Sequence, residues 1–134
     1  MKIENIKFKA KRLDNGEWII GSFVVMKIPA LSKTTIGIVA AGGATLHEVD
    51  PSTVCMFTGL KDCVGNEIWE GDILSNVTND SPDRIVVFKY GAFSLFAKNN
   101  RDFCIALTYL LSEKDSLNRF KVVGNKFDRK EGEK

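Results

Sequence analysis

The sequence predicts a mainly β fold, α+β at most, and three observations support this prediction. Short apolar or alternating segments recur along the chain between turn residues, which is typical of about eight to ten short strands. The helical connections that parallel strands require are absent from the pattern. The 134 residues, 44% of them hydrophobic, suffice for one domain with its own core. We therefore expect a β-barrel or sandwich with one or two short helices.

The first half of the chain is predicted to begin with a β-hairpin. Residues 6–13 alternate apolar and basic side chains, Asn15-Gly16 favours a tight turn, and residues 17–26 form the return strand. Residues 27–35, which contain Pro29, are predicted to form a loop. Short strands are expected at 35–40, 45–49 and 54–58, with a break at Gly42-Gly43 and a turn at Pro51.

The second half is predicted to continue as short strands. They cover residues 67–69, 73–78, 84–90 and 92–97, followed by a polar turn at 98–101. Residues 103–112 fit both the strand and the helix period, so we expect a strand that passes into a short helix at 109–115. A last strand is expected at 120–127, before a charged tail.

Composition excludes several classes of protein. A net charge of +2 is too small to imply nucleic acid or membrane as a partner. The three cysteines, Cys55, Cys63 and Cys104, are odd in number and form no C-x-x-C pair, which favours buried thiols in a reducing compartment. We expect no signal peptide and no membrane span, because no long apolar run is present. The predicted location is the cytoplasm.

Residues 58–74 read TGLKDCVGNEIWEGDIL, which resembles the signature of the YopX family, T-G-L-K-D-x-x-G-x-E-I-[YFW]-E-G-D-I. Residues 6–10, 87–93 and 122–125 are also similar to segments of that family. The signature residues are Thr58, Gly59, Leu60, Asp62, Gly65, Glu67, Ile68, Trp69, Glu70, Gly71 and Asp72.

The resemblance implies a small protein of a bacterial phage or prophage. It implies a single domain over residues 1–134, with an SH3-like β-barrel in the C-terminal half and an N-terminal β-hairpin extension. A possible subdivision places the extension at 1–57, the barrel at 58–128 and a frayed tail at 129–134. The family supplies no established activity, catalytic residue or cofactor.

The signature residues also have a structural interpretation. Gly59, Gly65 and Gly71 stand where tight turns would need a positive φ. Asp62 and Asp72 can accept backbone N–H bonds at those turns. The apolar members of the segment are predicted to be core: Leu60, Ile68, Trp69 and Ile73.

Two groups of residues suggest chemical sites as alternatives to this interpretation. Glu67, Glu70 and Asp72 are close enough for acid–base catalysis or Mg²⁺ binding, but turn capping and solvated charge are favoured, since no companion group is near. His47, the single histidine, belongs to no catalytic motif, and a zinc site would need it together with all three cysteines. We expect no catalysis, metal or cofactor.

A basic stripe is predicted on the first strand. Lys7, Lys9 and Lys11 share one face, Arg12 is adjacent, and Trp18 or Phe23 could offer a stacking surface for nucleic acid. The favoured alternative is an exposed strand face that lysines protect from edge-to-edge aggregation.

The favoured function is that of a phage or prophage accessory protein that binds an unknown host or phage protein, as a homo-oligomer. Phe103, Leu107, Leu110 and Leu111 are either core or an apolar face for a partner subunit. The alternatives are a nucleic-acid-interacting module and a small enzyme with a Glu/Asp cluster.

Overall fold

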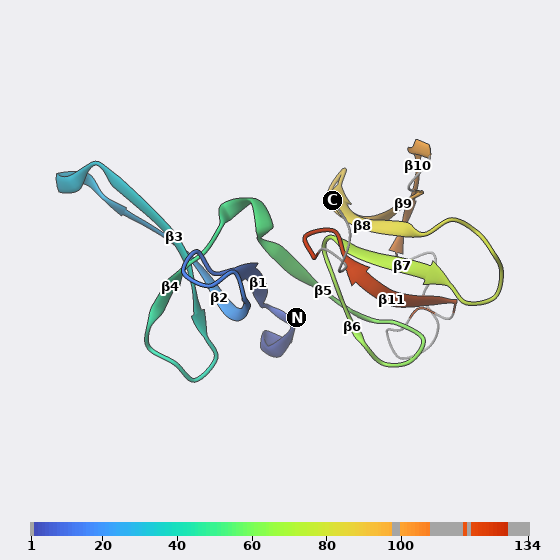
Figure 1. Ribbon diagram of the computed structural model, residues 1–134, viewed down its shortest axis with the longest axis horizontal. Helices are drawn as coiled ribbons and strands as arrows, with labels where there is room; N and C mark the ends of the chain where they lie inside the picture. Colours follow the sequence, from blue (N-terminus) through green and yellow to red (C-terminus); the bar gives the residue numbers. More distant parts are fainter. Residues whose placement is uncertain (1, 98–99, 108–116, 118, 129–134) are drawn as a thin grey trace. The chain divides into compact units, whose positions relative to one another are not determined.

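The mainly β prediction is confirmed by the structure, a computed structural model that describes residues 2–97, 100–107, 117 and 119–128. The described chain contains eleven strands in two antiparallel sheets and three short 3₁₀ helices (Figure 1). The elements are η1 (Ile3–Asn5), β1 (Phe8–Lys11), β2 (Trp18–Ile28), η2 (Pro29–Leu31), β3 (Lys33–Ala40), β4 (Leu46–Glu48), η3 (Pro51–Thr53), β5 (Cys55–Lys61), β6 (Glu67–Trp69), β7 (Asp72–Asn76), β8 (Arg84–Lys89), β9 (Ala92–Ala97), β10 (Asn100–Ala106) and β11 (Phe120–Asn125).

The chain divides into two compact units, Met1–Phe57 and Thr58–Lys134. The first sheet has six strands in the order β4-β3-β2-β1-β5-β6, of which β6 belongs to the second unit, and β1 has a neighbour on each side. Phe8 of β1 lies opposite Gly21 on β2 and Met56 on β5. Ala10, Ile38 and Val49 form the buried core of this unit. Phe8, Ile19, Phe23, Ile36 and Val54 pack against that core.

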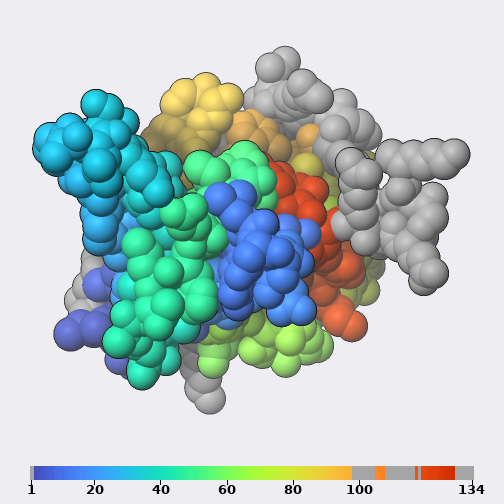
Figure 2. All heavy atoms as spheres, turned by 60° about the vertical axis from the view of Figure 1, so that its left-hand side comes forward, coloured from blue at the N-terminus to red at the C-terminus, as the bar shows by residue number. Residues whose placement is uncertain are grey.

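A two-stranded hairpin extends from this sheet. β2 and β3 pair continuously from Gly21–Ala40 to Ile28–Lys33, whereas β1 pairs with β2 only up to Gly21 and β4 reaches only Gly37. The outer part, residues 22–36, is called the arm below; it stands out from the rest of the first unit (Figures 1 and 2, pale blue to cyan).

The predicted loop at 27–35 is therefore wrong. Pro29 does not interrupt a strand, because it begins η2 at the tip of the hairpin, where its fixed φ is compatible with the turn. Ser32, with a φ of 48°, completes the reversal.

The second unit contains a five-stranded sheet in the order β10-β9-β8-β7-β11. Its core consists of Ile68, Leu74, Val86, Leu95, Leu107, Leu117 and Phe120, all buried. Leu107 is thus core and not part of an exposed apolar face. Among the described strands neither sheet closes on itself, so the predicted SH3-like barrel is not confirmed.

Two turns differ from their predicted forms. Asn15-Gly16 does not make a tight turn: β1 ends at Lys11, β2 begins at Trp18, and only Gly16 has a positive φ, at 72°. The two-residue hairpin is instead Tyr90-Gly91, with φ values of 55° and 78°, which is the combination that a type I′ turn requires. The predicted single turn at 98–101 is also wrong in its second half, since Asn100 and Arg101 belong to β10.

Three predictions lie outside the described residues: the short helix at 109–115, the apolar positions Leu110 and Leu111, and the frayed tail at 129–134. Within the described residues, no helix has the length and apolar character that crossing a membrane requires.

Candidate functional site

The predicted basic stripe lies on one face of β1 and covers aromatic rings. The Lys9 Nζ is 4.7 Å and the Lys11 Nζ 5.3 Å from the centroid of the Trp18 ring. The Lys7 Nζ is 4.6 Å from the centroid of the Phe57 ring on β5. These separations allow cation–π attraction.

The edge-strand explanation for these lysines is wrong, because β1 is an interior strand of its sheet. Its second neighbour is β5, a strand nearly fifty residues further along the chain, and Phe57 N donates to Lys7 O at 3.0 Å. Phe23 also lies elsewhere: it packs against Phe8 on the core side, with ring centroids 5.5 Å apart. Of the two predicted stacking residues, Trp18 lies against the lysines and Phe23 does not.

Arg12 is engaged by a neighbouring carboxylate. Its Nε donates to Asp14 Oδ1 at 2.9 Å, and a second nitrogen lies 2.5 Å from Asp14 Oδ2. The hydrogen bond from Arg12 lowers the pKa of Asp14, chiefly because it stabilises the ionised carboxylate. The positive charge of Arg12 is therefore partly compensated, and the three lysines carry the basic character of this face.

Asp62 is the most densely bonded residue of the signature segment. Its carboxylate accepts hydrogen bonds from Val64 N at 3.0 Å, Asn66 N at 2.8 Å and Asn66 Nδ2 at 3.1 Å. It also accepts one from Val122 N on β11, at 2.9 Å, from a residue 60 positions later. Asp62 is 1% exposed. Burial raises its pKa, but the four hydrogen bonds outweigh burial and the pKa is lowered overall.

Asp72 makes a second connection of the same kind. Its Oδ2 accepts from Trp69 N at 2.7 Å across the β6–β7 turn, and its Oδ1 accepts from Asn125 Nδ2 at 3.0 Å. Asp72 and Asn125 are both buried. Two buried aspartate side chains of the signature segment thus bond to β11, which carries the VVGN sequence at 122–125, in addition to the β7–β11 pairing.

Glu67 and Glu70 do not gather with Asp72 into a metal site. Both glutamates are half-buried, whereas Asp72 is occupied by the donors just described. No group of three or more His, Cys, Asp or Glu side chains that could hold a metal ion occurs in the part of the chain that the structure describes.

The glycines of the signature have the positive φ expected of them, at 81° for Gly59, 91° for Gly65 and 86° for Gly71. Gly65 lies in the β5–β6 turn, where Gly65 N donates to Asp62 O at 3.1 Å. Gly59, however, lies inside β5 and not at a turn, so its positive φ bends a strand. Thr58 steadies this point: its Oγ1 donates to Ile68 O at 2.6 Å and accepts from Leu60 N at 3.2 Å.

The described cysteines and the histidine belong to no common metal-binding group. Cys55 is buried and its Sγ contacts Thr53 O at 3.2 Å. Cys63 is exposed, so the prediction of a buried thiol is wrong there. The side chain of Cys104 is outside the description. His47 lies on β4 opposite Ile38.

The arm is a surface that the sequence interpretation missed. Val25 is 50% exposed, Met26 45% and Leu31 69%. The two lysines of the arm, Lys27 and Lys33, are the only charged residues between Trp18 and Leu46. The long apolar run at 18–28 indicates a long strand, but Pro29 at its end favoured a loop and hid the hairpin.

Comparison with known proteins agrees with the resemblance noted above. No curated protein matches this chain. A family model described as YopX protein matches residues 7–131. The matched range contains β1, the signature segment and β11, and therefore both aspartate connections. The chain belongs to the YopX family.

Proposed function

We propose that this protein is a phage or prophage accessory protein that acts in the bacterial cytoplasm by binding other proteins, and that the arm joins two copies of the chain. The single observation that supports this proposal is the exposed apolar surface of the arm. An isolated two-stranded hairpin is only marginally stable in water. A partner that covers Val25, Met26 and Leu31 would therefore stabilise the arm by burying their apolar surface.

A second copy is a suitable occupant because the arm has two open backbone edges. Beyond Gly21 the outer edge of β2 has no strand partner among the described residues, and the same holds for β3 before Gly37. An antiparallel edge can pair with its own copy about a two-fold axis, which makes the contact isologous. Lys27 and Lys33 limit open-ended addition of further chains, as lysines on edge strands do.

The oligomeric state tests this proposal directly. Light scattering on the purified chain over a range of concentrations is expected to show a dimer. Val25→Lys places a charge on the arm and is expected to give a monomer. Val77→Lys is the matched control, because Val77 is 54% exposed, close to the 50% of Val25, but lies outside the arm.

A monomer at every concentration would overturn self-association, and so would a Val25→Lys protein that remains dimeric. Binding of a host or phage protein is tested by pull-down from nuclease-treated bacterial lysate. If the Val77→Lys protein still captures a specific protein and the Val25→Lys protein does not, the arm also binds that protein. Retention of no protein by any variant, together with a monomeric wild type, contradicts the binding function.

The basic face of β1 favours a second candidate, a nucleic-acid-interacting module. Three ammonium groups line one face beside Trp18, an arrangement that suits phosphate contacts next to a stacking surface. Binding to single-stranded DNA is expected to weaken steeply as salt rises, because lysine–phosphate contacts release counterions. Lys9→Gln should lower both affinity and salt slope, while the control Lys121→Gln should not. Binding that is absent or insensitive to salt argues against this candidate.

We further propose that the second unit is an opened SH3-like barrel. Its strands β7 to β10 form a meander, and β11 returns to pair with β7. This return of the last strand to the first is compatible with the barrel that the family implies.

A further inference from the structure

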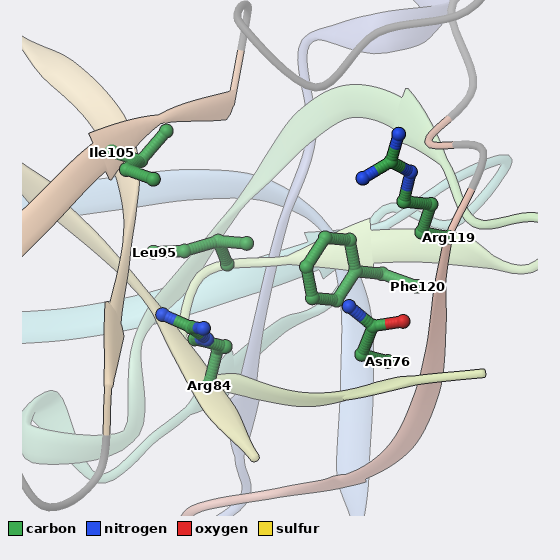
Figure 3. A pocket seen from close by; sticks show the side chains of 6 residues that line it. All are labelled: Asn76, Arg84, Leu95, Ile105, Arg119 and Phe120. Carbon is green, nitrogen blue, oxygen red and sulfur yellow. The ribbon is translucent and has the colours of Figure 1, made fainter. Parts of the chain in front are cut away.

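A pocket lies within the second unit, and every strand of the five-stranded sheet contributes to it or borders it. The pocket has a volume of about 140 Å³. It is lined by Asn76, Arg84, Leu95, Ile105, Arg119 and Phe120 (Figure 3). Arg84 and Arg119 are 35 positions apart in the chain, which is why no sequence motif announces the pair.

The interior of the pocket is apolar. Leu95 is 2% and Phe120 5% exposed, and Ile105 is half-buried. The volume is close to the roughly 150 Å³ that accommodates one benzene molecule in an apolar cavity. An apolar group of about that size therefore fits against these walls.

Polar donors complete the lining. Arg84 stands at the start of β8 and Arg119 just before β11, and Figure 3 shows the Phe120 ring between their guanidinium groups. The Asn76 oxygen accepts from Thr78 N at 2.9 Å and from Thr78 Oγ1 at 2.7 Å. Because the oxygen is committed to that turn, the amide nitrogen is the group that Asn76 can offer to a ligand.

The charges around the pocket select an anion. Two guanidinium groups line it, and none of the described residues in the lining is acidic. Each guanidinium carries five N–H donors in a planar fork, so it can keep a contact within the protein and still donate to a ligand. Carboxylate and phosphate oxygens match that fork in geometry and charge.

We propose that this pocket binds a small amphiphilic oxyanion, which is an apolar or aromatic group of about benzene size that carries a carboxylate or a phosphate. The apolar group packs against Leu95, Ile105 and Phe120. The oxyanion accepts hydrogen bonds from Arg84, Arg119 and the amide nitrogen of Asn76. The site shares no residue with the arm or with the basic face of β1.

Titration of the full chain, followed by NMR of the backbone amides, tests this proposal. Benzoate and phenyl phosphate serve as probes, and benzyl alcohol is the uncharged comparison. The anions are expected to shift the signals of Leu95, Ile105 and Phe120, whereas benzyl alcohol binds at least about tenfold more weakly, since it lacks the charge-assisted hydrogen bonds.

Variants identify the donors. Arg119→Gln is expected to weaken binding of the anions by about tenfold, and because Arg119 is exposed the fold tolerates this change. The matched control is Lys121→Gln, which removes a positive charge two residues further along the chain, on β11 but outside the pocket, and should leave binding unchanged. Absence of shifts with both anions overturns the proposal, and so does equal affinity of the wild type and Arg119→Gln.

The source of the anion is distinguished by a third set of probes. A short peptide that ends in phenylalanine is compared with the same peptide carrying a C-terminal amide. Tighter binding of the free acid than of both the amide and benzoate identifies the carboxyl terminus of a protein as the ligand. Binding of benzoate or phenyl phosphate without binding of the peptide identifies a free small molecule.

Discussion

At the scale of single residues, Asp62 shows how one buried charge can organise a fold. A carboxylate taken out of water is costly unless donors surround it, and Asp62 receives four hydrogen bonds. Three of them close the β5–β6 turn, and the fourth holds β11. The sequence revealed the local bonds, since Asp before a Gly-Asn turn is a common acceptor, but not the bond to Val122.

Asp62→Asn is expected to lower the free energy of unfolding at pH 7 by about 2–3 kcal/mol, because an amide cannot accept from all four donors and loses the charge. The lowered pKa of Asp62 stabilises the fold fully above the ordinary value of 3.8, and this contribution is lost as pH falls below 3.8 towards the folded pKa. Urea denaturation between pH 7 and pH 3 should show the two proteins converging in acid.

Asp14→Asn provides the control for this prediction. Asp14 also has a lowered pKa, but its side chain is 63% exposed and its partner Arg12 is at the surface. Solvent screens such pairs, so Asp14→Asn should change the unfolding free energy little at any pH. A constant difference between Asp62→Asn and the wild type over the whole pH range would contradict the role given to the Asp62 charge.

Gly21 illustrates a second constraint at this scale, the close approach of two backbones. A Cβ atom at this position would lie 2.0 Å from the carbonyl oxygen of Val39 on β3. Gly21→Ala should therefore destabilise the protein by about 1–3 kcal/mol or more through overpacking, measured by thermal unfolding. Gly124→Ala, where a Cβ meets nothing within 4 Å, should be close to neutral. Equal effects of the two substitutions would exclude overpacking as the cause.

At the scale of elements, local pattern predicted strands well and their connections less well. The strands at 84–89 and 92–97 agree with prediction to within one residue, because alternation and flanking turn residues mark them clearly. The arm was missed because Pro29 reads as a breaker whether it lies in a strand or at a hairpin tip. Gly59 was assigned to a turn because sequence shows the need for positive φ but not its place in a strand.

The Tyr90-Gly91 turn gives a prediction at this scale. Tyr90 has a φ of 55° and is 86% exposed, so a bulky residue occupies a left-handed position that suits Asn. Tyr90→Asn should stabilise the protein by about 0.5–1 kcal/mol, and Tyr90→Val should destabilise it, because β-branched residues tolerate this region poorly. A wild type that proves more stable than Tyr90→Asn in thermal unfolding would show that side-chain contacts of Tyr90, such as the Lys89 Nζ 5.1 Å from its ring, dominate.

At the scale of the whole molecule, the pairing of strands distant in the chain determines features that the sequence pattern does not predict. The basic face on β1 was predicted residue by residue, yet its interior position depends on β5. The pairing of β11 with β7 likewise joins distant segments. The family signature contains Asp62 and Asp72, whereas the fold alone identifies Val122 and Asn125 as their hydrogen-bond partners.

The division into two compact units predicts separate loss of protection from hydrogen exchange. Gly21→Ala should speed exchange at core amides of the first unit, such as Ala10 and Ile38, and spare Leu74 and Val86 in the second. Asp62→Asn should give the opposite pattern. Uniform acceleration across both units by either variant would show that the molecule unfolds as a single cooperative body.

The two aspartate connections also bear on how the protein is made. Asp62 and Asp72 are synthesised more than 50 residues before Val122 and Asn125. The hydrogen-bond donors on the last strand therefore become available only near the end of translation. A translation product that stops short of Val122 would keep two carboxylates that it can bury only at high cost. We therefore expect incomplete chains to be more open to cellular proteases than the full-length product.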